Sequence, residues 1–180
     1  MRIQFMRSSL YNQWDFCQQS TALQYMFGFG SETGKKACMG TIVHKVLQIL
    51  ADQKLAIQNK LEEFTDEELG RFHVDRIDID NLTSAAFNYY KSIEKHLVLV
   101  NLDLEACKSC VHKALKYSNG LVDPRNKEIV ATEQFFDFEI NQPWAKGLRM
   151  KGTVDLVVKS TDDLYEVIDY KGLPLETKIS

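Results

Sequence analysis

The chain contains no long apolar run, and this absence argues against a membrane-spanning or a secreted protein. No stretch approaches the roughly 20 apolar residues of a membrane-spanning helix. Residues 1–7 lack the apolar segment of a secretory signal. We therefore expect no membrane partner and a cytoplasmic location, in a bacterium or as a phage protein in its host. Internal repeats and low-complexity segments are also missing, and 180 residues suit one domain over 1–180.

Cysteine is scarce, with four residues, and none follows Cys110. So few thiols fit a reducing compartment better than a disulfide framework. Cys107 and Cys110 have the spacing of a zinc knuckle, but they fall inside an expected helix and no second pair accompanies them. We expect no zinc there, and we expect Cys17 to be an apolar residue of the first helix.

An excess of positive charge is lacking as well, since the formal net charge is −3. This balance argues neither for nor against a nucleic-acid partner. A nuclease with this net charge must concentrate positive charge around its cleft, because phosphate contacts supply much of the affinity for nucleic acid. Lys35, Lys36 and Lys151 lie close to the motifs described below and are candidates for nucleic-acid binding. Taken singly, each is equally explained as a solvated side chain.

The last forty residues hold two β-rich runs, 147–159 and 164–171, joined by the turn-prone residues 160–163. Asp155 lies in the first run, and Asp169 and Lys171 lie in the second. Residues two apart on a strand share a face, so Asp169 and Lys171 are expected to project together. A hairpin would bring Asp155 toward Asp169, and a divalent cation would keep both carboxylates ionised. This pattern predicts a metal-dependent phosphodiesterase, with an ordinary surface hairpin as the alternative.

A second signal lies upstream, around His44. Apolar residues at 42, 43, 46, 47, 49 and 50 repeat with a helical period, so a core helix is expected from Gly40 toward Asn59. Four further helices are expected: one over 8–27, a short one after Thr65, one that Asp80 or Thr83 opens and that runs to Leu97, and one over 104–117. The last is expected to be capped by Asp103 at its start and ended by Asn119-Gly120. A loop is expected over 28–34 and a strand over 129–140.

Together these motifs resemble the RecB-like branch of the PD-(D/E)xK nuclease superfamily, which includes AddB-like and CRISPR-associated exonuclease-like proteins. The order is Gly40-x-x-x-His44 on a helix, Gly152-x-x-Asp155 on a strand and Asp169-x-Lys171 on the next. The opening segment 8–28, with its Ser-Leu start, its cysteine and its Tyr-x-x-Gly end, also resembles the family. The resemblance spans both ends of the chain and leaves residues 52–125 unassigned.

The resemblance implies an α+β, restriction-endonuclease-like fold, with a helical N-terminal half followed by an antiparallel three-strand sheet that carries the active site. It implies that His44, Asp155, Asp169 and the carbonyl of Tyr170 bind Mg²⁺ or Mn²⁺ and that Lys171 positions the attacking water. Glu133 lies where some members carry another acidic residue, so it is a candidate lining residue or an ordinary strand carboxylate.

The implied function is a metal-dependent DNA nuclease, with exonuclease activity, in recombination, repair or phage DNA processing. The implied protein partner is a helicase or recombination protein. Only nine residues follow Lys171, so the C-terminal part of the family core is expected to be missing. An iron–sulfur cluster would need further cysteines from a longer parent chain. Two alternatives stay open: a nuclease-fold protein that binds DNA or a partner without cutting, and a helical interaction protein.

Overall fold

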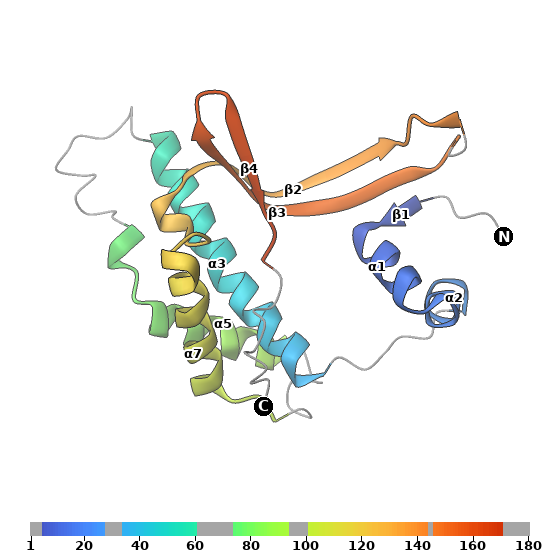
Figure 1. Ribbon diagram of the computed structural model, residues 1–180. Helices are drawn as coiled ribbons and strands as arrows, with labels where there is room; N and C mark the ends of the chain where they lie inside the picture. Colours follow the sequence, from blue (N-terminus) through green and yellow to red (C-terminus); the bar gives the residue numbers. More distant parts are fainter. Residues whose placement is uncertain (1–4, 28–33, 61–73, 94–100, 144–145, 171–180) are drawn as a thin grey trace. The chain divides into compact units, whose positions relative to one another are not determined.

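The computed structural model describes residues 5–27, 34–60, 74–93, 101–143 and 146–170 (Figure 1). They form two compact units, each described by itself. The helical unit comprises Thr33–Thr132 and Asp155–Ser180, and the N-terminal unit comprises Met1–Glu32 and Glu133–Val154. The predicted loop over 28–34 lies largely outside the described residues. Three other predictions lie outside them entirely: the short helix after Thr65, the helix end at Leu97, and Lys171 with the residues after it.

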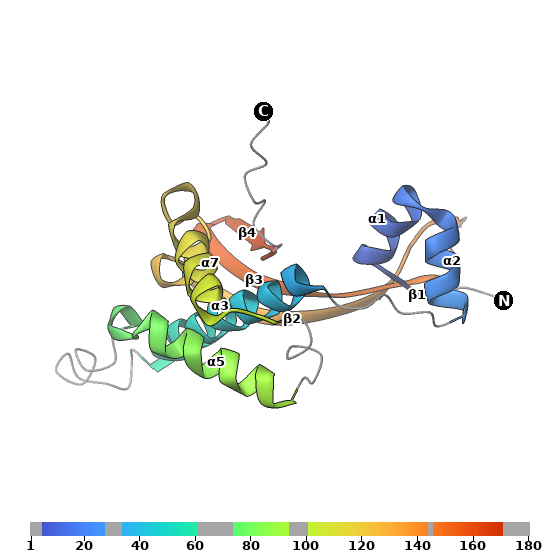
Figure 2. The ribbon, with the colours of Figure 1, turned by 90° about the horizontal axis from the view of Figure 1, so that it is seen from below.

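Three long helices pack together in the helical unit (Figures 1 and 2). They are α3 (Lys35–Lys60), α5 (Ile79–Ile93) and α7 (Leu104–Lys116). Ile42, Val46 and Leu50 of α3 are fully buried and form a core with Phe87 of α5 and Val111 of α7. The apolar period read around His44 therefore marks a core helix, as predicted. Three short 3₁₀ turns complete the unit: η1 (Val74–Arg76), η2 (Tyr117–Asn119) and η3 (Pro124–Asn126).

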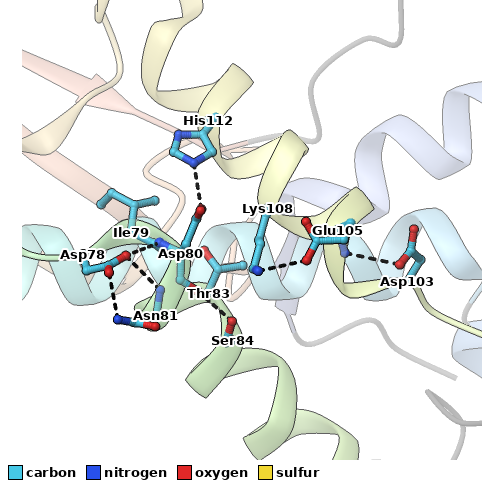
Figure 3. A network of polar contacts seen from close by, with 10 residues as sticks. All are labelled: Asp78, Ile79, Asp80, Asn81, Thr83, Ser84, Asp103, Glu105, Lys108 and His112. Atoms are coloured by element: carbon cyan, nitrogen blue, oxygen red, sulfur yellow. Dashed lines mark hydrogen bonds and ion pairs between the residues drawn. The ribbon is translucent and has the colours of Figure 1, made fainter.

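Side-chain caps set the start of α5 and α7 (Figure 3). Asp103 accepts a hydrogen bond from the Glu105 backbone N–H at 3.2 Å, as predicted. The prediction that Asp80 or Thr83 opens α5 is wrong. The Asp78 carboxylate accepts from the backbone N–H groups of Asp80 and Asn81, at 3.0 and 3.1 Å, so Asp78 caps the helix, which begins at Ile79. An acid at this position satisfies amides that have no partner within the helix.

The strands of the predicted sheet are β2 (Glu128–Glu139), β3 (Arg149–Thr161) and β4 (Leu164–Ile168). β3 has β2 and β4 as partners, and β4 runs antiparallel to it with Leu156 opposite Ile168. Within the helical unit, Ile129 of β2 and Leu156 and Val158 of β3 form a small core with Ala51 of α3. The predicted fold class is confirmed: helices in the first half, then a three-strand antiparallel sheet packed against them.

β4 is shorter than the predicted strand over 164–171, because it ends at Ile168. Two residues later, the Tyr170 backbone N–H donates to the side chain of Asp155 instead of a strand carbonyl. A backbone donor used in this way cannot extend the β ladder. The predicted strand is therefore wrong at its C-terminal end, and Asp169 follows the strand instead of lying in it.

The N-terminal unit holds β1 (Phe5–Arg7), α1 (Ser8–Phe16) and α2 (Gln18–Phe27), with β1 parallel to the start of β3. One helix over 8–27 was predicted, and this is wrong because the helix breaks at Cys17. The Cys17 sulfur accepts a hydrogen bond from the Ser20 backbone N–H at 3.4 Å, the position of a helix N-cap. Cys17 therefore starts a new helix and is not an apolar residue within the first.

β2 and β3 also pack closely within the N-terminal unit, where Gly152 faces the ring of Phe136. A Cβ atom at Gly152 would lie 2.5 Å from the ring, a distance that real Cβ atoms do not adopt. Glycine here allows an aromatic ring to cover the backbone of the neighbouring strand. The Gly-x-x-Asp motif on β3 thus has a packing reason for its glycine, three residues before Asp155.

Candidate metal centre

α3 presents one side to the small core formed with the sheet, and this side carries the first candidate ligand. Ala51 and Leu55 pack in that core. One turn beyond Leu55, the Gln58 side chain bonds both backbone groups of Ile129: its amide donates to the carbonyl at 3.2 Å, and its oxygen accepts from the N–H at 3.0 Å. His44 lies seven residues, or about two helical turns, before Ala51, so both residues lie on the same side of the helix.

His44 meets Asp155 across the space between α3 and β3. The His44 Nε2 atom lies 3.2 Å from Asp155 Oδ1, and the two side chains are 33% and 15% exposed. Fully buried Leu156 follows Asp155 on β3, which sets the position of the carboxylate. The helix motif and the strand motif are therefore brought together.

Tyr170 connects the end of the hairpin to both residues. Its backbone N–H donates to Asp155 Oδ2 at 2.7 Å. Its ring stands edge-on to the His44 ring, with centroids 5.8 Å apart and an interplanar angle of 62°. Tyr170 also packs against both hydrophobic cores of the helical unit. One carboxylate oxygen of Asp155 is thus held by the backbone, while the other faces the imidazole.

His44 and Asp155 are the candidate ligands that the helical unit itself supplies. An imidazole nitrogen and a carboxylate oxygen suit a divalent cation such as Mg²⁺ or Mn²⁺ by donor chemistry. Glu133, the predicted lining residue, is half-buried and belongs to the N-terminal unit.

The other predicted carboxylate ligand, Asp169, is exposed. The pairing of Leu156 with Ile168, continued by one residue, would set Asp169 opposite Asp155. Lys171 lies outside the described residues. The contacts made by the Tyr170 amide and ring were not predicted, because no sequence pattern shows where the end of a strand meets a distant helix.

The predicted nucleic-acid-binding lysines lie in different surroundings. Lys35 and Lys36 are exposed in the first turn of α3, and Lys35 is about 14 Å along the helix axis from His44. In the N-terminal unit, Lys151 pairs with Asp137 at 3.0 Å, and Arg149 pairs with the same carboxylate at 2.8 Å. Hydrogen bonds from Arg149 and then Lys151 lower the pKa of Asp137. The Asp137 carboxylate thus partly offsets the charge of Lys151. Lys35 and Lys36 are nearer to His44 in sequence than Lys151 is.

The two cysteines of the knuckle-like spacing lie in α7, as expected. Cys107 is fully buried, and burial is the main cause that raises the pKa of its thiol to about 11. A thiol with that pKa stays protonated near neutral pH, and the protonated form is a poor metal ligand. The Cys110 thiol contacts the Met39 sulfur at 3.5 Å. These residues serve packing between α3 and α7.

Comparison with known protein families gives one result. The family model described as PD-(D/E)XK nuclease superfamily matches residues 9–179. This match covers nearly the whole chain, including α3 and the hairpin. Searches of curated proteins and of solved structures give no significant match. None of the described helices is long and apolar enough to cross a membrane.

Proposed function

The chain belongs to the PD-(D/E)XK nuclease superfamily, and from this we propose that it is a metal-dependent DNA nuclease of the RecB-like branch that acts as an exonuclease. The observation that carries the proposal is the approach of His44 Nε2 to Asp155 Oδ1 at 3.2 Å, with the other Asp155 oxygen held by the Tyr170 backbone N–H. A nuclease family and a carboxylate held beside an imidazole are independent observations. Both lead to hydrolysis of a phosphodiester bond with a divalent cation.

The proposed ligands are His44, Asp155, Asp169 and the carbonyl of Tyr170, with Glu133 as an additional carboxylate. A bound Mg²⁺ or Mn²⁺ would neutralise charge on the scissile phosphate and lower the pKa of the attacking water. Asp155 suits this role because the Tyr170 N–H holds one of its oxygens and leaves the other facing His44. A ligand held in this way loses little conformational freedom when a cation binds.

Lys171 is proposed to orient the attacking water and to stabilise charge that develops on the phosphate. Lys35, Lys36 and Lys151 are proposed to contact the DNA backbone, where cations supply affinity without reading sequence. The proposed setting is recombination, repair or phage DNA processing in the cytoplasm, with a helicase or recombination protein as partner. The proposed domain is a single nuclease domain over 1–180.

The test combines metal binding with cleavage. Isothermal titration should show Mn²⁺ binding that weakens strongly in Asp155→Asn, while Asp80→Asn, an acid on α5, leaves it unchanged. Cleavage of end-labelled DNA should require Mg²⁺ or Mn²⁺ and should stop with chelator. Lys171→Ala should abolish cleavage and retain Mn²⁺ binding, because an ammonium group cannot be a metal ligand.

Two outcomes would contradict the proposal. A folded protein that binds no Mn²⁺ would exclude the metal centre. Near-normal cleavage by a metal-replete Lys171→Ala variant would exclude the role given to the lysine. Metal binding and DNA binding without cleavage would instead favour the non-catalytic alternative, a nuclease-fold protein that binds DNA without cutting it.

A further inference from the structure

Tyr170 attaches the end of the hairpin to the interior of the helical unit. Two residues earlier, Ile168 pairs with Leu156 and packs in the small core beneath the sheet. Tyr170 packs against that core and also against the larger core of α3, α5 and α7. Asp169, between these two residues, is exposed. Packing therefore holds the side chain of Tyr170 in place, although the strand ends at Ile168.

Tyr170 contacts both candidate ligands of the helical unit, each with a different part. Its backbone N–H donates to Asp155 Oδ2 at 2.7 Å. Its ring meets the His44 ring edge-on, with centroids 5.8 Å apart. Aromatic rings favour edge-on contacts at centroid separations of about 4.5–7 Å. The backbone of one residue thus holds the carboxylate, while its side chain packs on the imidazole.

The pair that Tyr170 contacts already has a spacing that suits a cation. His44 Nε2 lies 3.2 Å from Asp155 Oδ1. Two neighbouring ligands of an octahedral Mg²⁺, each about 2.1 Å from the ion, lie about 3.0 Å apart. The two atoms therefore need to move little when a cation binds, as long as both side chains keep their orientations. His44 is the more exposed of the two, at 33% against 15%, so a neighbouring contact has the larger effect on its ring.

We propose that Tyr170 is a positioning residue, whose ring edge holds the His44 imidazole in the orientation that binds a cation beside Asp155. The inference rests on the proposed function, because it treats His44 as a metal ligand. It is distinct from the role proposed for the Tyr170 carbonyl. The ring acts through His44, and the phenolic hydroxyl takes no part.

Matched substitutions separate the ring from the hydroxyl and from the backbone. Tyr170→Leu removes the aromatic edge and keeps an apolar side chain, the backbone N–H and the carbonyl. It should weaken Mn²⁺ binding about 10–100-fold in isothermal titration, the range typical of residues that orient ligands. Tyr170→Phe keeps the ring and should stay within about twofold of wild type. Tyr165→Leu is the control, because it makes the same change at a tyrosine of β4 that is 57% exposed.

A double variant distinguishes positioning of His44 from general support of the site. Adding Tyr170→Leu to His44→Ala should cause no further loss of Mn²⁺ affinity, because the ring acts through the imidazole that is already absent. Fully additive losses would overturn the proposal, since they would show that Tyr170 acts on the site without His44.

Two results with single variants would also overturn the proposal. Equal weakening by Tyr170→Phe and Tyr170→Leu would show that the hydroxyl acts and the ring edge does not. Wild-type affinity in a folded Tyr170→Leu variant, with Asp155→Asn still impaired, would exclude the positioning role while leaving the proposed function intact.

A metal-free measurement tests the contact itself. Nuclear Overhauser effects should join the ring protons of Tyr170 and His44 in the wild type, and coupling constants should show one dominant χ1 rotamer for His44. Tyr170→Phe should keep that rotamer, Tyr170→Leu should average it, and the His112 signals should not change. Tyr170→Met, with a flexible side chain that fills irregular gaps, is a second variant without the ring.

This measurement separates failure of the inference from failure of the proposed function. If the wild type binds no Mn²⁺, the proposed function fails, and the metal-free spectra still decide whether Tyr170 orients His44. Absence of the Tyr170–His44 effects in the wild type would overturn the inference even if neither variant folds. An unchanged His44 rotamer in folded Tyr170→Leu or Tyr170→Met would overturn it as well.

Discussion

Two histidine–aspartate pairs in the helical unit look alike by distance and differ in their surroundings. His112 of α7 lies 2.8 Å from Asp80 of α5, and the side chains are 47% and 54% exposed (Figure 3). His44 and Asp155 are separated by 3.2 Å and are less exposed. The shorter contact lies on the surface between two helices. In the longer one, a backbone N–H holds the aspartate.

The difference shows that a short contact does not by itself identify a metal centre. Among the described residues, the Asp80 side chain meets a single histidine and is held by no backbone group. Asp155 belongs to a strand whose next residue is fully buried, and its own side chain is held on one oxygen. A ligand held in place on a rigid framework, and not proximity alone, is what suits a cation.

The largest effect is expected when the packing under the His44–Asp155 pair is removed. Leu156 is fully buried, so Leu156→Ala should lower the free energy of unfolding by about 2–5 kcal/mol, through lost burial and a residual cavity. Urea denaturation followed by circular dichroism measures this loss. Val167→Ala, at a residue of β4 that is 65% exposed, should change stability by no more than about 0.5 kcal/mol. Equal effects of the two changes would show that this small core does not support the site.

The second effect compares the two histidines directly. His44→Ala should weaken Mn²⁺ binding at least about 10–100-fold, because a ligand should cost no less than the residues that orient it. His112→Ala should leave Mn²⁺ affinity unchanged. Both are measured by isothermal titration on folded protein. Loss of metal binding in His112→Ala alone would reverse the assignment of the two pairs.

The third effect concerns the helix start that carries the surface pair. Asp78 accepts hydrogen bonds from two backbone amides of α5 and from the Asn81 side chain. Asp78→Ala should therefore lower the free energy of unfolding by about 1 kcal/mol. Asp78→Asn keeps an acceptor oxygen and should lose less. Mn²⁺ affinity should not change in either variant, and a change there would link α5 to the metal centre.

The smallest effect is expected at the surface pair. A double-mutant cycle of Asp80→Asn and His112→Ala should give a coupling of about 0.2–1 kcal/mol in thermal denaturation, because water and salt screen exposed pairs. The coupling should fall further at 1 M salt, where screening acts over about 3 Å. A coupling well above this range at high salt would show that the pair is more than a surface contact.

Local patterns predicted much of the fold. The apolar period around His44 identified α3 as a core helix, and Asp103 identified the start of α7. β-rich composition and a turn-prone segment identified the β3–β4 hairpin. These features depend on residues close together in the chain, so local propensity and periodicity are enough.

The wrong predictions share a different origin. The break at Cys17, the earlier start of α5 and the end of β4 at Ile168 each depend on which side chain a backbone amide meets. In the first two, the N-cap residue is Cys17 or Asp78, and the sequence offered other residues that could cap the helix equally well. The third depends on Asp155, fifteen residues away from Tyr170, and no local pattern could show it.

The sequence by itself determined the order of the helix, the strands and their chemically active residues, because periodicity and residue type are properties of the chain. Tertiary structure decided which of those residues meet. It brought His44 to Asp155 and held that carboxylate with the Tyr170 amide. Contacts between residues this far apart in sequence arise only when packing fixes strands against a helix, so the donor set exists only in the folded chain.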